Sequence, residues 1–465
     1  MNKSTFDLIV IGAGPGGYVA SIRAAQLGMH VCCIDKGPLG GTCLNVGCIP
    51  SKALLESSEL YHQARTSFDH HGIHVSSIDL NLSDMMKRKE KIVETMTRGV
   101  KSLFSKNKIE HTAGTARIKN PTTVEIRNGD TVSQLSTKRI LIATGSTPVI
   151  LPGLPFDGTH IINSTGALSL TKIPERLVVI GAGAIGLELG SVWSRLGAKI
   201  IVVEIMDHII PGMDREMTAQ LQRLLEKQGI SFRLETNVTG AQIVNGKVIL
   251  SLSSGSKQST EECDRVLVAV GRRAYTEGLG LEELKISRDE KGRILINKNY
   301  ETNVSGIYAI GDVIPGLMLA HKAEEEGIAA VEIMTGKAGH VNYNAIPSVV
   351  YTFPELASVG ITEEHLKEEG LKVRIGKFPF KANGRAHCLD AVDGFVKIIS
   401  DEKTDRILGM HILSAHASDI IAEGVVAIEF AGSAEDLARS VHAHPTLPEA
   451  IKEAALSVDK RAIHI

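Results

Sequence analysis

The sequence predicts an α/β protein with two Rossmann-like dinucleotide-binding domains. The first observation is an apolar run that leads into the pattern Gly12-x-Gly14-x-x-Gly17. The second is a later copy of the same pattern, Gly181-x-Gly183-x-x-Gly186, with the same kind of flanking residues. A single glycine pattern is common, but two copies in matching contexts indicate two βαβ units. In such a unit the glycines let the backbone approach a pyrophosphate at the N-terminus of a helix.

Each glycine pattern is followed by the other elements that a βαβ unit requires. In the first copy we expect a helix over 18–27, then an apolar strand over 30–34 that ends at Asp35. In the second copy a helix ends near Gly197, and a strand over 199–203 ends at Glu204. The acid stands at the same distance from the first glycine in both copies. There it can accept hydrogen bonds from the hydroxyls of a ribose.

Two further apolar runs end in glycine, which is typical of strands that return to each sheet, and a third run ends in Gly-Asp. They are 138–145, which ends in Gly145, 264–271, which ends in Gly271, and 308–312, which ends in Gly-Asp at Asp312. The carboxyl ends of strands are where open α/β sheets bind their ligands. Asp312 is therefore a candidate ligand-binding residue, although Gly-Asp is also an ordinary turn.

The residue types indicate which nucleotide each unit binds. Glu204 accepts from a free 2′-hydroxyl and repels a 2′-phosphate, and no Arg or Lys stands at 205–208. The second unit is therefore expected to bind NAD. The first unit runs directly into a cysteine pair, so its nucleotide is expected to carry a redox group. FAD is the natural choice, because a flavin exchanges electrons with both a dithiol and a nicotinamide.

The cysteine pair is Cys43 and Cys48, within Gly40-Gly-Thr-Cys-Leu-Asn-Val-Gly-Cys-Ile-Pro-Ser-Lys52. In a reducing compartment a closely spaced pair beside a nucleotide is more often catalytic than structural. A zinc site would need more ligands than these two thiols offer, so no metal is expected. A structural bridge remains an alternative. The other cysteines carry no such signal: Cys32 and Cys33 are expected in the core of a strand, and Cys263 and Cys388 have no assigned role.

Composition narrows the class of protein. The chain has 465 residues, 43% hydrophobic and 22% charged, with 45 glycines, a length that predicts several domains. A net charge of −2 gives no reason to expect a nucleic-acid partner. No apolar run reaches the ~20 residues of a membrane span, and the N-terminus has no secretory signal. These features favour a cytoplasmic protein without a membrane partner.

These motifs resemble one known family, the flavin disulfide reductases, and within it the branch that oxidises dihydrolipoyl groups with NAD. The likeness covers essentially the whole chain and includes the cysteine motif, the two glycine patterns, Ala143–Gly145, Leu319–Lys322 and His442–Glu449. The resemblance implies a homodimer with four domains. They are an FAD domain at 1–148, an NAD domain at 149–272, a central domain at 273–344 that completes the FAD site, and a C-terminal α+β dimerisation domain at 345–465. It also implies lipoyl domains of 2-oxo acid dehydrogenase complexes, and of the glycine cleavage system, as partners.

The resemblance also implies roles for individual residues. Cys43 and Cys48 form a redox disulfide, in which Cys43 exchanges with substrate and Cys48 faces the flavin. Lys52 lies near the flavin and pairs with Glu188. His444 is the acid–base group that reaches the disulfide of the opposite subunit, Glu449 orients it, and the bond before Pro445 is cis. The remaining implied cofactor residues are Thr144, Gly145, Gly271, Asp312 and Ala320.

Some alternatives stay open. Thr446–Glu449 also reads as a helix capping box, and His442 is expected to be structural. A reductase for glutathione or another disulfide would favour NADPH, which Glu204 disfavours. A mercuric reductase would need a C-terminal cysteine pair, and 460–465 contains none. A flavoprotein without catalytic activity, acting as a tether or sensor inside a complex, is the alternative from a different class.

Overall fold

The computed structural model describes residues 5–465, which divide into two compact units. The first unit contains the chain up to Leu54 together with Asn81–Val149 and Gly271–Val341. The second contains Leu55–Leu80, Ile150–Val270 and Asn342–Ile465. Each unit is built around its own sheets, and each is described separately.

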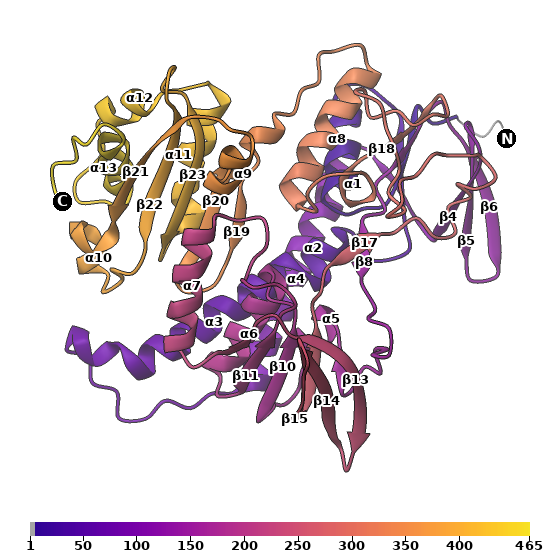
Figure 1. Ribbon diagram of the computed structural model, residues 1–465. Coiled ribbons are helices and arrows are strands. Elements are labelled where there is room, and N and C mark those ends of the chain that lie inside the picture. The colour runs from indigo at the N-terminus through magenta and orange to yellow at the C-terminus, as the bar shows by residue number, and fades with distance from the viewer. Residues whose placement is uncertain (1–4) are drawn as a thin grey trace. The chain divides into compact units, whose positions relative to one another are not determined.

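The first unit is organised around a five-stranded parallel sheet with the order β18-β7-β1-β2-β3. Its strands are β1 (Leu8–Ile11), β2 (Val31–Asp35), β3 (Glu110–Ala113), β7 (Ile140–Ile142) and β18 (Ile307–Ala309). Strands β1, β7 and most of β2 are buried and rich in Ile, Val and Leu, as expected for a parallel sheet covered on both faces. The helices of this unit are α1 (Pro15–Gln26), α2 (Gly41–Val46), α4 (Leu82–Lys106), α8 (Ala320–Met334) and the start of α3 (Cys48–Thr66). Helix α8 packs along α1 (Figure 1).

Two smaller sheets complete the first unit. One is the antiparallel meander β4 (Thr115–Asn120), β5 (Thr123–Asn128) and β6 (Thr131–Ser136). The other is a two-stranded ribbon in which β8 (Ser146–Pro148) pairs antiparallel with β17 (Arg272–Ala274). This ribbon brings together two segments that follow predicted glycines, Gly145 and Gly271.

The second unit repeats the parallel arrangement, with the strand order β12-β11-β10-β16-β9. These strands are β9 (Ile161–Ile162), β10 (Arg176–Ile180), β11 (Lys199–Val203), β12 (Ser231–Arg233) and β16 (Arg265–Val268). Helices α5 (Ser164–Ala167), α6 (Ala184–Arg195) and α7 (Arg215–Lys227) belong to the same part of the chain. An antiparallel sheet follows, made of β13 (Asn237–Val244), β14 (Lys247–Ser254) and β15 (Lys257–Cys263).

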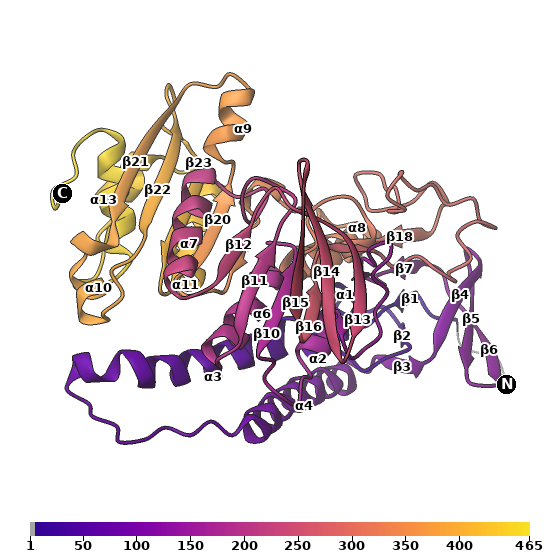
Figure 2. The ribbon, with the colours of Figure 1, turned by 60° about the horizontal axis from the view of Figure 1, so that its bottom comes forward.

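The C-terminal part of the second unit is a five-stranded sheet with helices, with the order β19-β20-β23-β22-β21. Its strands are β19 (Ser348–Val350), β20 (Glu355–Gly360), β21 (Val373–Pro379), β22 (Phe395–Asp401) and β23 (Ile407–Ser414). Its helices are α9 (Glu363–Glu368), α10 (Gly384–Cys388), α11 (Ala417–Glu429), α12 (Ala434–Arg439) and α13 (Glu449–Val458). Helix α11 packs on β20 and β23, and α13 packs on β21 and β22 (Figure 2).

The predicted elements of both βαβ units are present. The returning strands pair as expected, because β7 lies parallel to β1 and β16 lies parallel to β10. The first helix begins at Pro15 rather than at Tyr18, since proline is well tolerated in the first turn of a helix. The predicted strand 199–203 is β11 with the same bounds.

Candidate functional site

The two glycine loops have the same geometry. Gly12 has a φ of +107° and Gly181 a φ of +102°, values that favour glycine strongly. A Cβ atom on Gly12 would lie 2.2 Å from Ala143 O, and one on Gly181 would lie 2.6 Å from Ala269 O. The loops therefore pass so close to the neighbouring strand end that no side chain fits.

The other glycines of the two patterns leave the helix N-termini open. A Cβ atom on Gly17 would lie 1.8 Å, and one on Gly186 2.2 Å, from the carbonyl oxygen of the first glycine of the same loop. Gly14 and Gly183 are the N-cap residues of α1 and α6, and a Cβ at either would meet nothing within 4 Å. Neither helix has a side-chain cap. Each N-terminus can therefore receive a pyrophosphate, so both loops fit a dinucleotide.

The two predicted acids occupy equivalent places. Asp35 Oδ2 accepts from the N–H of Ala13 at 2.5 Å, and Glu204 Oε2 accepts from the N–H of Ala182 at 2.7 Å. Each acid also accepts from the N–H two residues further along, at 2.8 and 2.9 Å respectively. Both carboxylates are thus fixed across the glycine loop at the end of the second strand. This is where a dinucleotide ribose is expected.

The remaining predicted cofactor residues of the first unit gather at one edge of its parallel sheet. The neighbouring parallel strands β18, β7 and β1 lead at their carboxyl ends to Asp312, Thr144 and Gly12 respectively. Thr144 is held by its hydroxyl, which donates to Tyr275 O at 2.6 Å. Ala320 is the first residue of α8, which packs on α1.

Two of the predicted glycines adopt left-handed backbone conformations that side chains rarely tolerate. Gly145 has a φ of +72° and Gly271 a φ of +119°. The chain turns at each of them into the ribbon of β8 and β17, where the N–H of Val149 donates to Gly271 O at 3.1 Å. Both positions therefore need glycine.

The cysteine pair is anchored on the first glycine loop. The N–H of Gly40 donates to Ala13 O at 2.8 Å, and a Cβ atom on Gly41 would lie 2.6 Å from the Cα of Gly14. Helix α2 begins at this contact and carries Cys43, and α3 begins at Cys48. The fold therefore holds the two thiols next to the loop that fits a dinucleotide.

Both cysteines of the pair are thiols without a disulfide bond in this structure. Cys43 is half-buried and Cys48 is exposed. The hydrogen bond with Cys48, then burial, raises the pKa of the Cys43 thiol, and Glu324 acts in the same direction while Lys52 opposes it. Lys52 lies in α3 one turn after Cys48, as the spacing predicts. The two sulfur atoms are thus near enough to interact directly.

Tyr18 and Glu324 lie beside Cys43 and were not singled out from the sequence. Tyr18 Oη donates to Glu324 Oε1 at 3.3 Å. Burial, together with Glu324, raises the pKa of Tyr18 to about 12, and burial raises the pKa of Glu324. Neither residue stands in a recognisable motif of its own, so no local signal identified them.

Glu188 lies in α6, where its carboxylate is buried and accepts from the N–H of Tyr351 at 3.1 Å. The structure therefore shows a partner for Glu188 that the sequence did not predict. The pairing of Glu188 with Lys52 stays a prediction.

The C-terminal pair has the predicted geometry. His444 Nδ1 lies 2.9 Å from Glu449 Oε1, and Glu449 Oε2 accepts from the N–H of Thr446 at 2.7 Å. Burial raises the pKa of Glu449, but the Thr446 N–H and His444 outweigh it, so the net shift is downward. The His444–Pro445 bond is cis, as predicted. The imidazole is 80% exposed, which leaves Nε2 accessible for proton transfer.

The alternative capping-box interpretation is wrong in part. Glu449 does reach back to the N–H of Thr446, but the Thr446 hydroxyl donates to Ala443 O rather than capping a helix. Helix α13 begins at Glu449 itself, with Pro448 as N-cap. The neighbouring His442 pairs with Glu423 at 2.8 Å.

The other cysteines are not part of the dithiol pair, although Cys33 Sγ donates to Gly12 O at 3.8 Å. Cys32 and Cys33 are buried in β2, as expected, and burial raises the pKa of Cys32 to about 11 and that of Cys33 further. Cys263 is buried at the end of β15, and burial raises its pKa to about 12. Their thiols therefore stay protonated at neutral pH, and only Cys388 and the Cys43–Cys48 pair are accessible to solvent.

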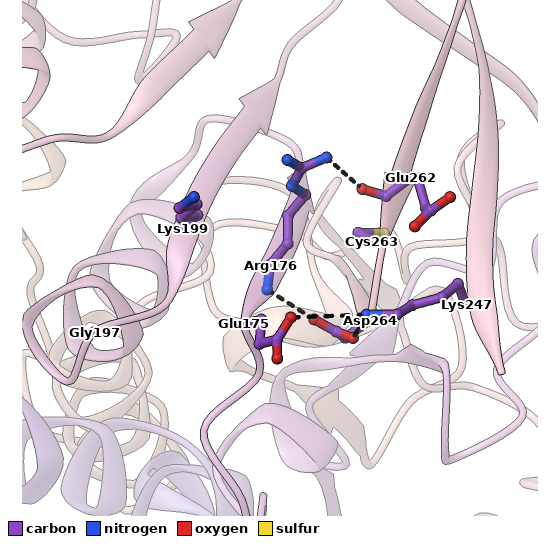
Figure 3. A pocket seen from close by; sticks show the side chains of 8 residues that line it. All are labelled: Glu175, Arg176, Gly197, Lys199, Lys247, Glu262, Cys263 and Asp264. Carbon is purple, nitrogen blue, oxygen red and sulfur yellow. Dashed lines mark hydrogen bonds and ion pairs between the residues drawn. The ribbon is translucent and has the colours of Figure 1, made fainter.

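A cavity of about 390 Å³ lies in the second unit, at the sheet edge where β10 and β11 begin. Figure 3 shows its lining, which carries charges of both signs. The Arg176 guanidinium donates to Glu262 O at 3.0 Å, and Lys247 pairs with Asp264. Because the Gly181 loop follows the opposite end of β10, this cavity contains none of the predicted site residues. It is lined by Glu175, Arg176, Gly197, Lys199, Lys247, Glu262, Cys263 and Asp264.

Across residues 5–465, every helix is either too short or too polar to span a lipid bilayer. Over the same range, no three His, Cys, Asp or Glu side chains converge in a way that could hold a metal ion.

Two dinucleotide cradles and a dithiol define a flavin-dependent disulfide oxidoreductase, and comparison with known proteins agrees. The family model described as pyridine nucleotide-disulphide oxidoreductase matches residues 6–327, and the model of that family's dimerisation domain matches residues 346–455. The chain belongs to the pyridine nucleotide-disulphide oxidoreductase family.

Close relatives cover almost the entire chain. It is 52% identical over 99% of its length to dihydrolipoyl dehydrogenase, mitochondrial, from Pisum sativum, of which it covers 92%. It is 53% identical over 99% of its length to dihydrolipoyl dehydrogenase 2, mitochondrial, from Arabidopsis thaliana, of which it covers 91%. It is also 52% identical over 99% of its length to leghemoglobin reductase from Glycine max, of which it covers 89%.

Solved structures show the same fold. LpdA from Mycobacterium tuberculosis matches with a TM-score of 0.90 and 26% identity, over 97% of this chain and 99% of that one. The flavoprotein disulfide reductase RclA from Escherichia coli matches with a TM-score of 0.85 and 25% identity over the same shares. These matches confirm the expected fold class.

The expected cytoplasmic location is wrong. The relatives from pea, Arabidopsis, Dictyostelium discoideum and Bos taurus, at 50–53% identity, are mitochondrial proteins. The expectation depended on the lack of an apolar secretory signal. Mitochondrial import uses amphipathic, Arg-rich segments instead, so that absence does not decide the compartment.

Proposed function

We propose that this protein is a dihydrolipoyl dehydrogenase, which oxidises protein-bound dihydrolipoyl groups to lipoyl groups with NAD as the final acceptor. The observation that carries the proposal is the contact between the Gly40–Gly41 segment and the first glycine loop, which holds the two thiols beside a dinucleotide cradle. Relatives of the same name that are 52–53% identical over nearly the whole chain support the substrate assignment. Its cofactors are FAD and NAD.

The chemistry of the chain begins with the oxidised cysteine pair. A thiolate of the dihydrolipoyl group attacks the Cys43 sulfur, the Cys43–Cys48 bond breaks, and Cys48 leaves as a thiolate. The second substrate thiolate then attacks the substrate sulfur of this mixed disulfide. The lipoyl ring closes, and both electrons of the substrate remain on the two cysteines. When bound, FAD supplies the two-electron carrier that connects this dithiol with NAD.

A proton acceptor is needed because a thiol must lose its proton before it attacks. His444 of the partner subunit would take that proton at Nε2, since Glu449 holds its Nδ1. Lys52 would stand near the reacting edge of the flavin and pair with Glu188. These roles rest on the resemblance to the family, with the His444–Glu449 geometry as support.

The remaining assignments concern nucleotides and domains. The residues that would hold FAD are Gly12, Gly14, Gly17, Asp35, Lys52, Thr144, Gly145, Asp312 and Ala320. Those that would hold NAD are Gly181, Gly183, Gly186, Glu204 and Gly271. The FAD domain would span 1–148, the NAD domain 149–272, the central domain 273–344 and the interface domain 345–465. The match to a dimerisation domain supports a homodimer. Its partners would be the lipoyl domains of 2-oxo acid dehydrogenase complexes and of the glycine cleavage system.

A spectrum and one assay test the proposal. Purified protein should be yellow, and two-electron reduction with NADH should develop long-wavelength absorbance from a thiolate beside the flavin. The protein should then reduce lipoamide with NADH, and with NADPH much more slowly. A colourless protein would contradict the proposal. A yellow protein that turns over glutathione disulfide but not lipoamide would support another reductase, and one that turns over neither would be a non-catalytic flavoprotein.

A further inference from the structure

Three polar side chains form a chain of hydrogen bonds at the edge of the first unit where the predicted FAD residues gather. Arg272 donates twice to Ser146, from Nε to Oγ at 2.8 Å and from Nη2 to the carbonyl oxygen at 2.7 Å. Ser146 Oγ in turn donates to Asp312 Oδ2 at 2.5 Å. These hydrogen bonds join Ser146 to Arg272, which lies 126 positions later in the sequence, and to Asp312, which lies 166 positions later.

The direction of these hydrogen bonds follows from which groups can donate a proton. A hydroxyl has one proton. Because Arg272 Nε occupies an acceptor site on Ser146 Oγ, the Ser146 proton is free to point at Asp312. One carboxylate oxygen of Asp312 is therefore fixed. Its other oxygen, Oδ1, accepts no hydrogen bond from residues 5–465 and remains available to a ligand hydroxyl.

The backbone around these residues keeps the arrangement rigid. Ser146 and Arg272 lie in the facing strands β8 and β17, in which Ser146 pairs with Ala274 and Pro148 with Arg272. Asp312 follows Gly311, which has a φ of +76°. Neither Arg272 nor Ser146 was predicted as a site residue, although each directly follows a predicted glycine.

We propose that Arg272 and Ser146 are positioning residues of the FAD site, which hold Asp312 with Oδ1 free to accept from the cofactor. This inference rests on the proposed function, because it takes Asp312 as a residue that contacts FAD. Neither residue needs to touch the reacting atoms. They act through the carboxylate.

The positive charge of Arg272 is consistent with a role in holding the Asp312 carboxylate. Burial lowers the pKa of Arg272, whereas the negative charges of Asp312 and of the Cys48 thiolate oppose that shift. A half-buried cation near these two groups therefore favours both anions. Removing it should also disfavour the Cys48 thiolate.

A double-mutant cycle on FAD affinity tests the proposal, with holoenzyme and released FAD measured by fluorescence. Ser146→Ala and Arg272→Met should each raise the dissociation constant of FAD about tenfold. The Asp312→Asn background already lacks the carboxylate charge. There the same two changes should each raise the dissociation constant of FAD less than about twofold, because both residues act through the Asp312 carboxylate. Arg273→Met is the matched control. Arg273 is the next residue on β17 and is exposed, and among residues 5–465 its side chain pairs with Glu277 alone, so its loss should leave FAD affinity unchanged.

A spectroscopic readout separates charge from geometry. In two-electron-reduced Arg272→Met, the pH midpoint of the long-wavelength absorbance should rise by about half a unit or more. In Ser146→Ala and Arg272→Lys, which keep the cation, it should stay within about 0.2 units of wild type.

Two results would overturn the proposal. One is FAD affinity in Ser146→Ala and Arg272→Met that equals that of Arg273→Met. The other is a loss that is equally large with and without the Asp312 carboxylate, as expected of a purely structural role. If Arg272→Met does not fold, Ser146→Ala and Arg272→Lys still complete the cycle. A wild-type protein without FAD would instead contradict the proposed function.

Discussion

Lys397 Nζ lies 2.8 Å from Asp214 Oδ2, and both side chains are completely buried. The same ammonium lies 2.6 Å from Glu363 and 3.1 Å from Glu216. Lys397 belongs to β22, Asp214 is the N-cap of α7, and Glu363 is the first residue of α9. One lysine with three donors thus serves three carboxylates of the second unit, two at the start of α7 and one at the start of α9.

Replacing this lysine should destabilise the second unit strongly. Lys397→Met leaves a buried Asp214 without its counter-ion, and breaking a buried pair in this way costs about 3–5 kcal/mol. Thermal unfolding monitored by circular dichroism should show a clearly lower melting temperature. Lys377→Met is the control, because Lys377 faces Lys397 on the neighbouring strand but is partly exposed, and its ammonium pairs with Glu216 alone among the three carboxylates. Equal melting temperatures for the two variants would contradict the assignment.

His411 should make stability depend on pH between about 4.5 and 6.5. It is fully buried, and burial lowers its pKa to about 4, with Asp214 and Glu363 opposing and Lys397 reinforcing that shift. Above pH 6.5 both folded and unfolded states hold a neutral imidazole. Below pH 6.5 the His411 imidazole binds a proton in the unfolded state but stays neutral in the folded state. Stability is therefore lost as pH falls, by up to about 1.4 kcal/mol per pH unit.

The test compares wild type with His411→Gln, which does not titrate but can still hydrogen-bond to Ser358, the neighbour 2.9 Å from Nδ1. Between pH 7 and pH 5 the melting temperature of wild type should fall further than that of the variant. Glu363 has its pKa lowered to about 2 by Lys367 and Lys397 against the effect of burial. Its own contribution is lost only below about pH 4.5, outside this window. Parallel curves would show that His411 does not titrate as inferred.

The elements predicted best are those that contiguous residues specify. The strand 199–203 and the positions of Asp35 and Glu204 follow from local patterns, because glycine spacing and apolar runs define a βαβ unit within about 25 residues. The start of α1 was placed three residues late. Gly16 and Gly17 read as loop residues, whereas they stand in the helix so that it can approach the loop and α8 closely.

Tertiary pairs could not be predicted in the same way. Lys397 and Asp214 are 183 residues apart, and nothing in either segment indicates the other. The contact from Arg272 to Ser146 is equally non-local. The Thr446 hydroxyl donates back to Ala443 around the cis His444–Pro445 bond, which the capping interpretation of 446–449 did not take into account. Residues within a motif could be singled out as site candidates from the sequence, whereas residues that contact them from another segment could not.

Nucleotide preference should depend on Glu204. Its carboxylate is buried at the end of β11 and would repel a 2′-phosphate. In Glu204→Ala the ratio of kcat/KM for NADH to that for NADPH should fall about tenfold or more. Glu175→Ala is the control, because Glu175 lies at the opposite edge of the same sheet and is 91% exposed. An unchanged ratio in Glu204→Ala would remove this residue from the nucleotide site.

Cys43 should be indispensable for the thiol reaction. Cys43→Ser removes the sulfur that substrate attacks, so lipoamide turnover should disappear while FAD stays bound. Cys388→Ser is the control, since Cys388 is also solvent-accessible but stands alone in α10. Steady-state assays and the visible spectrum of each variant check this. Turnover by Cys43→Ser would refute the exchange role.

His442 and His444 allow a matched comparison. His444 pairs with Glu449 at 2.9 Å and His442 pairs with Glu423 at 2.8 Å, so both imidazoles are held by a carboxylate. They differ in access, because His444 is 80% exposed and His442 only 9%. His444→Ala should slow reduction of the enzyme by dihydrolipoamide about 10²-fold or more, measured by stopped flow. His442→Ala should change that rate little, since a buried imidazole cannot meet a substrate thiol.

Glu449→Gln refines this comparison, because it keeps the side-chain shape and removes the charge. The variant should lose part of the same rate, and the acidic limb of its pH–rate profile should shift to lower pH. The carboxylate stabilises the imidazolium, so without it the neutral base that accepts the thiol proton already predominates at lower pH, and the acidic limb of the profile alone should move down by about one unit. Glu423→Gln should leave both limbs in place. An acidic limb that moves equally in the two variants would mean that Glu449 acts on the helix start of α13 rather than on His444.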